Sequence, residues 1–276
     1  MEKLLFGTAG VPISAKEHSS QAGIIRVGEL GLGCMELEFV HGVRMGDETA
    51  SEVSSARKKA GITMTAHGPY YVNLNAKEPE KLRASANRIL ETARVLKKCG
   101  GWSCTFHAAF YLGMPPENVY LAVKKQLEGI VSTLKSEKND VWLRPETTGK
   151  PSQFGSLDEI LRLSSEIDQV LPCVDFAHLH SRSGGKENSA AEFRSTLEKI
   201  EKSLGHEALK NMHIHFSGIN YSKKGELNHL TLEESDLKYK ELLSAWKEFN
   251  ISGCAISESP NIEGDAMLMR GLYQKL

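Results

Sequence analysis

The stretch Ile62-Thr63-Met64-Thr65-Ala66-His67-Gly68-Pro69 is a short strand-like run that ends in a histidine and a Gly-Pro turn. Other predicted strands along the chain stop in the same way, at a histidine or at a carboxylate. Six of the ten histidines and three carboxylates hold such positions: His67, His107, His178, His180, His213, His215, Glu146, Asp175 and Glu258. Side chains at the ends of consecutive parallel strands converge when the strands close into a barrel. The sequence therefore predicts a ring of histidines and carboxylates at one mouth of a barrel.

Strand-like and helical patterns alternate along the chain. The strand-like runs are Leu4–Gly7, Cys34–Val40, Ile62–Ala66, Trp102–Phe106, Val141–Pro145, Leu171–Phe176, Met212–Phe216 and Cys254–Ser257. The clearest stretches with apolar residues at helical spacing are Pro79–Lys98, Pro116–Lys135, Leu157–Val170, Ala190–Leu204 and Glu233–Phe249. This alternation predicts the α/β class and a (β/α)8 TIM barrel. A doubly wound open sheet is the alternative, and it would gather ligands at one crevice.

Length and composition fit one barrel. The 276 residues exceed the ~250 that such a barrel needs, and no linker or low-complexity segment divides them. We therefore expect one domain over residues 1–276. No run approaches the ~20 apolar residues of a membrane span, and the start of the chain is too short an apolar run for a signal peptide. The five cysteines are odd in number and form no C-x-x-C pair, which indicates reduced core thiols in a cytoplasmic protein. We also expect a monomer.

The net charge of −1 argues against a nucleic-acid protein, because many of these are basic. Divalent ions bound at the barrel mouth would reverse that argument locally, since their charge would attract a phosphodiester. The richest loops after strands are Thr147–Gly155, Ser181–Asn188 and Asn220–His229. Basic residues in loops of this kind are candidates for phosphate contacts, and we single out Arg44, Lys150, Arg182 and Lys223.

Individual candidates each have a structural alternative. His67 and His107 could be buried histidines with satisfied hydrogen bonds, but two neighbouring strands that end in histidine favour metal ligands. Glu146 also ends a strand, where a buried carboxylate needs a partner. That partner is either Arg144 or a metal ion, and we favour the metal.

The segment Val174-Asp175-Phe176-Ala177-His178 places a carboxylate at a strand end and an imidazole three residues later. Such a pair can serve two adjacent ions, and its chemistry suits zinc or manganese. His180 either replaces His178 or orients a ligand. His213 and His215 lie two residues apart and point to the same side of a strand, so spacing does not choose between them.

The sequence leaves the roles of two further pairs of residues undecided. Glu36 and Glu38 alternate along the second strand-like run, either as polar filling of the barrel mouth or as contacts to substrate and metal ligands. Tyr70 and Tyr71 follow His67 and could stack on a base or sugar, or only pack at the rim.

The ordered set of these motifs resembles the endonuclease IV family of apurinic/apyrimidinic (AP) endonucleases over nearly the whole chain. The motifs that carry the resemblance are Ala66-His67-Gly68-Pro69-Tyr70, Phe106-His107, Pro145-Glu146-Thr147-Thr148-Gly149, Val174-Asp175-Phe176-Ala177-His178, Met212-His213-Ile214-His215 and Ser257-Glu258-Ser259. The resemblance implies a (β/α)8 barrel that holds three zinc ions and cleaves DNA at abasic sites.

The resemblance also implies roles for individual residues. His67 and His107 look like ligands of a first ion, and Glu146 like the carboxylate that bridges it to a second. The remaining matches are Asp175, His213 and Glu258 for the second ion and His178 for the third. The family usually completes the third site with an Asp-x-His pair, whereas this chain reads Glu226-Leu227-Asn228-His229. We assign Glu226 and His229 to that site, although His229 comes one residue late.

These roles predict a zinc-dependent DNA-repair enzyme, with Mn²⁺ as an alternative metal. It would act on double-stranded DNA in base excision repair and hydrolyse the phosphodiester on the 5′ side of an abasic site. The products would be a 3′-hydroxyl and a 5′-deoxyribose phosphate. Glu146 and Glu258 would fix the ion spacing and help position the nucleophile. Tyr70 and Arg44 are candidates to fill the gap left by the missing base.

Two other functions remain open. A divalent-metal-dependent sugar isomerase or epimerase can share this barrel and use Glu, Asp and His ligands, typically with one or two ions. A non-catalytic protein that binds damaged DNA is the third possibility, and the irregular stretch from Glu226 to His229 is its only support.

Overall fold

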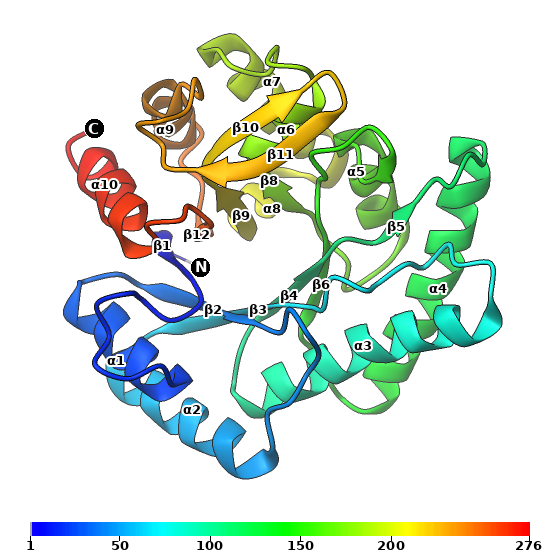
Figure 1. Cartoon of the computed structure of the whole chain (residues 1–276), viewed down its shortest axis with the longest axis horizontal. Helices are drawn as coiled ribbons and strands as arrows, with labels where there is room; N and C mark the ends of the chain where they lie inside the picture. The colour runs from blue at the N-terminus through cyan, green and yellow to red at the C-terminus, as the bar shows by residue number, and fades with distance from the viewer. Residues whose placement is uncertain (1) are drawn as a thin grey trace.

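Eight parallel strands form a nearly closed barrel in the computed structural model, which describes residues 2–276 (Figure 1). The strands are β1 (Leu4–Ala9), β2 (Cys34–Glu38), β3 (Thr63–His67), β4 (Ser103–Phe106), β6 (Trp142–Pro145), β8 (Cys173–Asp175), β9 (Met212–Phe216) and β12 (Gly253–Ser257). Their order is β6-β4-β3-β2-β1-β12-β9-β8. The two outer strands meet through the parallel bridges Leu143–Val170 and Glu146–Cys173. The predicted barrel is confirmed, and the open sheet is excluded.

Helices surround the barrel (Figure 1). They are α1 (Ser20–Glu29), α2 (Asp47–Ala60), α3 (Pro79–Lys98), α4 (Pro116–Ser136), α5 (Leu157–Glu166), α6 (Phe176–Arg182), α7 (Ala190–Leu204), α8 (His206–Leu209), α9 (Tyr239–Glu248) and α10 (Glu263–Tyr273). Two small antiparallel pairs lie outside the barrel: β10 (Gly218–Ser222) with β11 (Gly225–Leu230), and β5 (Ala109–Phe110) with β7 (Gln153–Phe154). The helices α3 and α7 have the predicted bounds.

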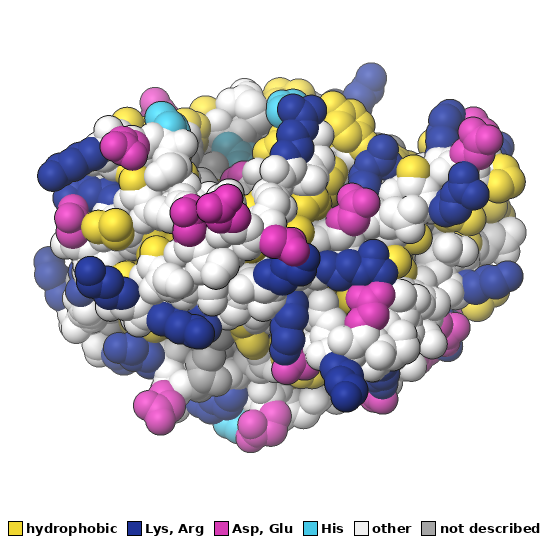
Figure 2. All heavy atoms as spheres, turned by 90° about the horizontal axis from the view of Figure 1, so that it is seen from below, with side chains coloured by type: hydrophobic (Ala, Val, Ile, Leu, Met, Phe, Trp, Pro, Cys, Tyr) yellow, Lys and Arg dark blue, Asp and Glu magenta, His cyan; other side chains and the backbone are white. Residues whose placement is uncertain are grey.

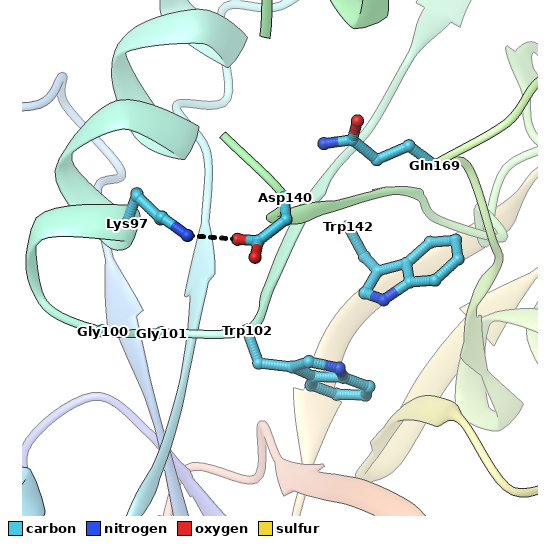
Figure 3. Close-up of a pocket in the computed structure, with 7 residues that line it drawn as sticks. All are labelled: Lys97, Gly100, Gly101, Trp102, Asp140, Trp142 and Gln169. Carbon is cyan, nitrogen blue, oxygen red and sulfur yellow. Dashed lines mark hydrogen bonds and ion pairs between the residues drawn. The ribbon is translucent and has the colours of Figure 1, made fainter. Parts of the chain in front are cut away.

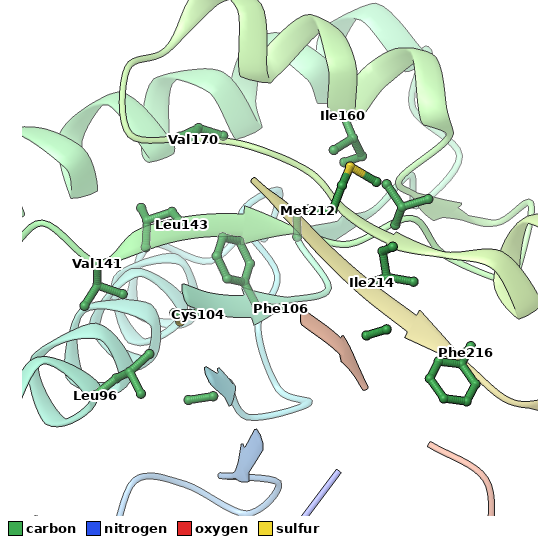
Figure 4. Packing of buried hydrophobic residues seen from close by; sticks show 14 of the residues in the cluster. Leu96, Cys104, Phe106, Val141, Leu143, Ile160, Val170, Met212, Ile214 and Phe216 are labelled. Atoms are coloured by element: carbon green, nitrogen blue, oxygen red, sulfur yellow. The ribbon is translucent and has the colours of Figure 1, made fainter. Parts of the chain in front are cut away.

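The large apolar core lies between the barrel and its helices. Along β9, Met212, Ile214 and Phe216 belong to this core, and Figure 4 shows them in one cluster with side chains from the surrounding helices. His213 and His215 alternate with them, so they face the barrel interior, and both are completely buried. The interior itself is polar, because strand residues on the inward side are often charged or hydroxylated. This arrangement is what brings titratable groups together inside the barrel.

Two predicted boundaries and one predicted loop are wrong. The helix expected from residue 233 begins at Tyr239, because Ser235 and Asp236 instead bind Ile219 of β10 and His180 of α6 through their side chains. The helix expected to reach residue 170 ends at Glu166, followed by Gln169 in a left-handed conformation. The expected loop Asn220–His229 is the β10–β11 hairpin.

Two sequence expectations about the chain as a whole can be compared with the structure. All five cysteines are free and buried, as core thiols should be. Among the helices of residues 2–276, none is both long enough and apolar enough to cross a membrane.

Gly7 of β1 tests the packing of the barrel wall. A Cβ atom at this position would lie 1.9 Å from the carbonyl oxygen of Cys34 in β2. We expect Gly7→Ala to lower the free energy of unfolding by about 3 kcal/mol or more, because backbone must move to relieve the clash. Gly129→Ala is the matched control. Gly129 lies within α4, where an added Cβ meets nothing within 4 Å, so this change should stabilise the protein by about 0.5–1 kcal/mol. Chemical denaturation measures both values, and equal effects would contradict this packing.

Candidate metal centre

The carboxyl ends of the barrel strands gather histidines and carboxylates into overlapping groups. Four groups could each hold an ion, and three of them form the mouth of the barrel: His67, His107 and Glu146; Glu146, Asp175, His215 and Glu258; and His178, His229 and Glu258. The fourth group, Cys173, His213 and His215, shares His215 with the second. Within each group, one ligand atom per residue lies within 4.8 Å of the others. Glu146 belongs to the first and second groups, and Glu258 to the second and third. Consequently the three groups form one continuous cluster.

The first group combines the ends of β3, β4 and β6. The Nδ1 atom of His67 lies 2.7 Å from the carbonyl oxygen of Gly68, which turns Nε2 toward Glu146. The distance from His67 Nε2 to Glu146 Oε2 is 3.2 Å, and His107 Nε2 lies 3.3 Å from the same oxygen. The structure therefore brings together all three residues that we assigned to a first ion.

The second group shows how a strand end becomes a ligand position. Asp175 ends β8 and caps α6: its Oδ1 accepts a hydrogen bond of 2.6 Å from the backbone N–H of His178. This leaves Oδ2 free to face the cluster, and it explains why α6 begins directly after the strand. The short helix, which the sequence analysis missed, places His178 close to Glu146, with Nδ1 3.0 Å from Oε1.

His215, not His213, joins Glu146, Asp175 and Glu258. The Nδ1 atom of His215 lies 3.4 Å from Glu258 Oε1 and 3.5 Å from Glu146 Oε1. His213 sits one layer deeper, where its Nδ1 is 2.9 Å from the hydroxyl of Ser103. The geometry thus differs from our assignment of His213, and it selects between two residues that sequence spacing left equivalent.

The third group includes the irregular stretch from Glu226 to His229. In the β10–β11 hairpin, Tyr221 pairs with Glu226 and Asn220 pairs with Asn228, so Leu227 is an extra residue that forms a β-bulge. Residues three apart normally face opposite sides of a strand, but a bulge between them restores the same side. Glu226 Oε2 lies 3.6 Å from His178 Nε2, and the rings of His178 and His229 are 5.6 Å apart. Both predicted residues therefore reach the cluster.

The residues present fit a divalent ion. Three buried polar atoms of the second group have no hydrogen-bond partner among the described residues: Glu146 Oε1, Asp175 Oδ2 and His215 Nδ1. Unpaired buried acceptors are costly, and a cation among them would give all three a partner. Carboxylate oxygens and imidazole nitrogens are also the ligands that zinc and manganese accept.

The pKa values of residues in the cluster also fit a site for cations. Burial lowers the pKa of His67, but its hydrogen bond to Glu146 and the negative charges of Glu146, Glu38 and Glu36 together outweigh burial and raise that pKa to about 10. Burial raises the pKa of Glu258 to about 8. Burial also raises the pKa of Glu38 to about 8, and the negative charge of Glu36 adds to this effect. The protein without ions thus retains protons at the barrel mouth, and bound cations would displace them.

The predicted DNA contacts lie in different environments. Tyr70 is 55% exposed, and its ring centroid is 5.6 Å from that of His67, at the rim of the cluster. Arg44 and Lys223 are exposed, and Lys150 is half-buried. Arg182 instead braces the loop after β6, where its Nη1 donates to the carbonyl oxygens of Thr148, Lys150 and Gln153. Arg182 thus has a structural role in this loop, and its contact with phosphate stays a prediction.

Other features of the molecule lie away from the cluster. His180 pairs with Asp236 at 2.9 Å, so it does not replace His178. A hollow of 620 Å³ at the amino-terminal ends of the strands is lined by Trp102, Trp142, Gln169 and the Lys97–Asp140 ion pair (Figure 3). No residue of the three groups lines this hollow. On the face shown in Figure 2, basic and acidic side chains are interspersed.

Sequence reasoning left the role of Glu36 undecided. Glu36 of β2 is completely buried, and it lies within 3.0 Å of both His213 and His215. Its inward direction follows from the alternation along β2. The contact between Glu36 and β9, however, depends on how the barrel closes, and the local sequence pattern does not predict this.

Comparisons with known proteins identify the kind of barrel. The sequence profile of the family described as "Xylose isomerase-like TIM barrel" matches residues 25–272. An uncharacterized protein of Methanocaldococcus jannaschii is 46% identical over 273 residues, which cover 99% of this chain and 98% of that protein. The protein named "Probable endonuclease 4" of Geobacillus sp. (strain WCH70) is 26% identical over 167 residues, or 58% of this chain and 54% of that protein.

Solved structures support the fold. Endonuclease IV from Thermus thermophilus has a TM-score of 0.72 at 15% identity, with 98% of this chain and 100% of that chain covered. A D-tagatose 3-epimerase-like protein has a TM-score of 0.72 at 16% identity, with 97% and 96% covered. At these identities the likeness extends to the barrel and does not choose between the two chemistries.

The pKa values of the cluster predict how stability changes with pH. The pKa of His67 rises from 6.5 to about 10 on folding, so its contribution is complete below pH 6.5 and is lost as pH rises through 10. The pKa of Glu258 rises from 4.5 to about 8, so its contribution is complete below pH 4.5 and is lost as pH rises through 8. We therefore expect the unfolding temperature of chelator-treated protein to fall between about pH 6.5 and 8.5.

Zinc should reverse this trend, because its ligands must lose their protons to bind it. The stabilisation that zinc adds is expected to grow over the same pH range. Thermal unfolding with chelator and with zinc measures both trends. A chelator-treated protein that becomes more stable toward pH 8.5 would contradict the proton-retaining cluster.

Proposed function

This chain belongs to the Xylose isomerase-like TIM barrel family, and from that premise we propose that it is a zinc-dependent AP endonuclease. Its reaction is hydrolysis of the phosphodiester on the 5′ side of an abasic site in double-stranded DNA. The products are a 3′-hydroxyl and a 5′-deoxyribose phosphate. One observation carries the proposal: three ligand groups overlap through the shared carboxylates Glu146 and Glu258.

Shared carboxylates favour phosphoryl chemistry over chemistry at a single ion. A carboxylate common to two groups could serve two ions at once, as two-metal phosphodiester hydrolysis requires, where the ions are typically about 3.5–4 Å apart. Divalent ions bound there would polarise the phosphoryl oxygens and lower the pKa of water near the phosphorus. A phosphodiester resists attack because it repels hydroxide and has a poor leaving group, so such help is needed.

The residues of the chain supply orientation. His67 is turned toward the cluster by the Gly68 carbonyl, and Asp175 is held by the backbone N–H of His178. Glu146 is almost completely buried, which fixes its two oxygens between the first and second groups. The exposed ring of Tyr70 lies at the rim beside His67, and it would stack where an abasic nucleotide leaves a gap.

The relatives named endonuclease 4 support the proposal at low identity. Geobacillus sp. (strain WCH70) and Oceanobacillus iheyensis each have one that is 26% identical over 58% and 62% of this chain. The substitution of Glu226 and a bulged His229 for an Asp-x-His pair does not weaken the proposal, since both side chains reach His178.

A sugar epimerase is the second candidate, because one observation favours it. Glu146, Asp175, His215 and Glu258 form a four-residue group that could hold a single ion without the others. D-tagatose 3-epimerase-like and D-psicose 3-epimerase structures share the fold. Metal content separates the two functions: about three zinc ions per chain support the nuclease, whereas one or two manganese or magnesium ions support the epimerase.

Incubation with a duplex that contains one abasic analogue tests the nuclease proposal. We expect strand cleavage on the 5′ side, and its loss after chelation. Glu146→Gln should reduce the cleavage rate by more than about 100-fold, because even outer ligands cost 10–100-fold in metal affinity or activity. Glu201→Gln is the matched control, since Glu201 pairs with the exposed His206 at 2.8 Å, outside the three groups.

Each other outcome of that incubation has a meaning. Binding of the abasic duplex without cleavage, even with added zinc, would show a non-catalytic DNA-binding protein. Epimerisation of a ketose with manganese and no action on the duplex would establish the second candidate. Cleavage that persists in Glu146→Gln would contradict the shared-carboxylate site.

Tyr70 is tested separately, by affinity for abasic DNA. Loss of a stacking ring costs about 1–3 kcal/mol, so Tyr70→Ala should weaken binding about tenfold. Tyr71→Ala is the control, because Tyr71 is similarly exposed but lies against Arg88, whose guanidinium carbon is 5.9 Å from its ring. If Tyr70→Ala binds and cleaves like the unaltered protein, Tyr70 has no part in recognition.

A further inference from the structure

A buried network lies directly beneath the metal groups, inside the barrel. Its centre is Glu36, whose carboxylate lies between two imidazoles of β9: Oε2 is 3.0 Å from His213 Nε2, and Oε1 is 2.8 Å from His215 Nε2. The side chains of all three residues have no exposed surface. The hydroxyl of Ser103 from β4 completes the network, 2.9 Å from His213 Nδ1.

The chemistry of these groups dictates where their protons lie. A carboxylate only accepts hydrogen bonds, so both imidazoles must present Nε2–H to Glu36. When the proton of His213 lies on Nε2, facing Glu36, its Nδ1 is an acceptor. The hydroxyl of Ser103 can then donate to Nδ1. The Nε2–Glu36 contacts are close in distance but are not aligned as hydrogen bonds, since both oxygens of Glu36 and both Nε2 atoms have no hydrogen-bond partner among residues 2–276. Protons on both Nε2 atoms are still the arrangement that a carboxylate at these distances favours.

The same argument leaves His215 with a lone pair that faces the metal groups. With its proton on Nε2, a neutral His215 has a free lone pair on Nδ1. That atom faces Glu258 Oε1 at 3.4 Å and Glu146 Oε1 at 3.5 Å, and it has no hydrogen-bond partner among residues 2–276. A bare lone pair directed at two carboxylates is unfavourable, so this nitrogen needs either a proton or a cation, and a bound cation would replace the proton.

We propose that Glu36 is a positioning residue, which holds His215 with its proton on Nε2 so that Nδ1 is presented to a divalent ion. His213 and Ser103 hold the other side of the same carboxylate and thereby fix its orientation. Glu36 does not contact substrate, because His215 separates it from the barrel mouth. Carboxylates that hold metal-binding histidines in this way raise metal affinity by about 10–100-fold.

This inference rests on the proposed metal groups, but not on the reaction that they catalyse. It applies equally to a nuclease and to an epimerase. It also separates His213 from His215, since only the latter has a ring nitrogen that faces Glu146 and Glu258.

Glu36→Gln tests the proposal without a change of size. The amide offers one acceptor and one donor, so it cannot accept hydrogen bonds from both Nε2–H groups. We expect one zinc-binding step to weaken by about 10–100-fold, measured as zinc per chain at buffered concentrations of free zinc. In the zinc-loaded protein labelled with ¹⁵N-histidine, the His215 Nε2–H signal should be protected from exchange, and that protection should be lost in the variant.

Asp236→Asn is the matched control, because Asp236 is the carboxylate partner of another buried histidine, His180, away from the three groups. It should leave every zinc-binding step and the His215 signal unchanged. Should Glu36→Gln fail to fold, Glu36→Asp keeps the charge with a shorter reach, and an intermediate loss of affinity is expected.

The possible results are distinguishable. A folded Glu36 variant with unaltered zinc binding and an unaltered His215 signal would overturn the positioning role. Loss of one whole zinc ion, with the remaining steps unchanged, would also overturn it, because Glu36 would then be a direct ligand of a deeper ion. Absence of zinc binding in the unaltered protein would remove the proposed function as well. Normal zinc binding without DNA cleavage would leave the positioning role intact and remove only the nuclease.

Discussion

Burial of negative charge inside the barrel is the constraint on which the rest of the structure depends. Glu36, Glu146 and Asp175 are each at most 1% exposed, and an unpaired buried carboxylate is among the most costly groups in a protein. The chain meets this cost with imidazoles from β3, β9 and the ends of β4 and β8. The pairing is incomplete, since several of these atoms have no partner among the described residues. The proposed divalent ions would supply the missing partners.

The barrel follows from the sequence because its signals are local. Alternation along β9 separates an apolar outer face from a histidine-bearing inner face, and the amphipathic stretches of α3 and α7 end where their helices end. Closure of the sheet also follows, since only a ring unites ligands from strands that are distant in the chain. The differences arise where distant contacts override local pattern, as at residues 233–238, which bind β10 and α6 instead of extending α9.

The sequence predicted which residues gather at the mouth of the barrel, but it predicted their depths and mutual contacts less well. His67, His107, Glu146 and Asp175 end their strands or follow them directly, and this position alone directs them to the mouth. His213 and His215 have the same local pattern, so their different depths emerge only from the layers of the closed barrel. The contact of Glu36 with β9 could not be predicted either. It joins β2 and β9, which are not neighbours in the sheet, and hydrophobic periodicity carries no information about contacts between such strands.

The bulge at Leu227 has a consequence for how chains of this kind are compared. It inserts one residue between Glu226 and His229, the two residues proposed as ligands, without moving either side chain out of reach of His178. Hairpin irregularity can thus absorb an evolutionary insertion while the chemistry persists. Motif searches that require a fixed spacing between ligand residues will miss such chains. In divergent relatives a site can therefore look lost in the sequence although its residues still meet in the folded protein.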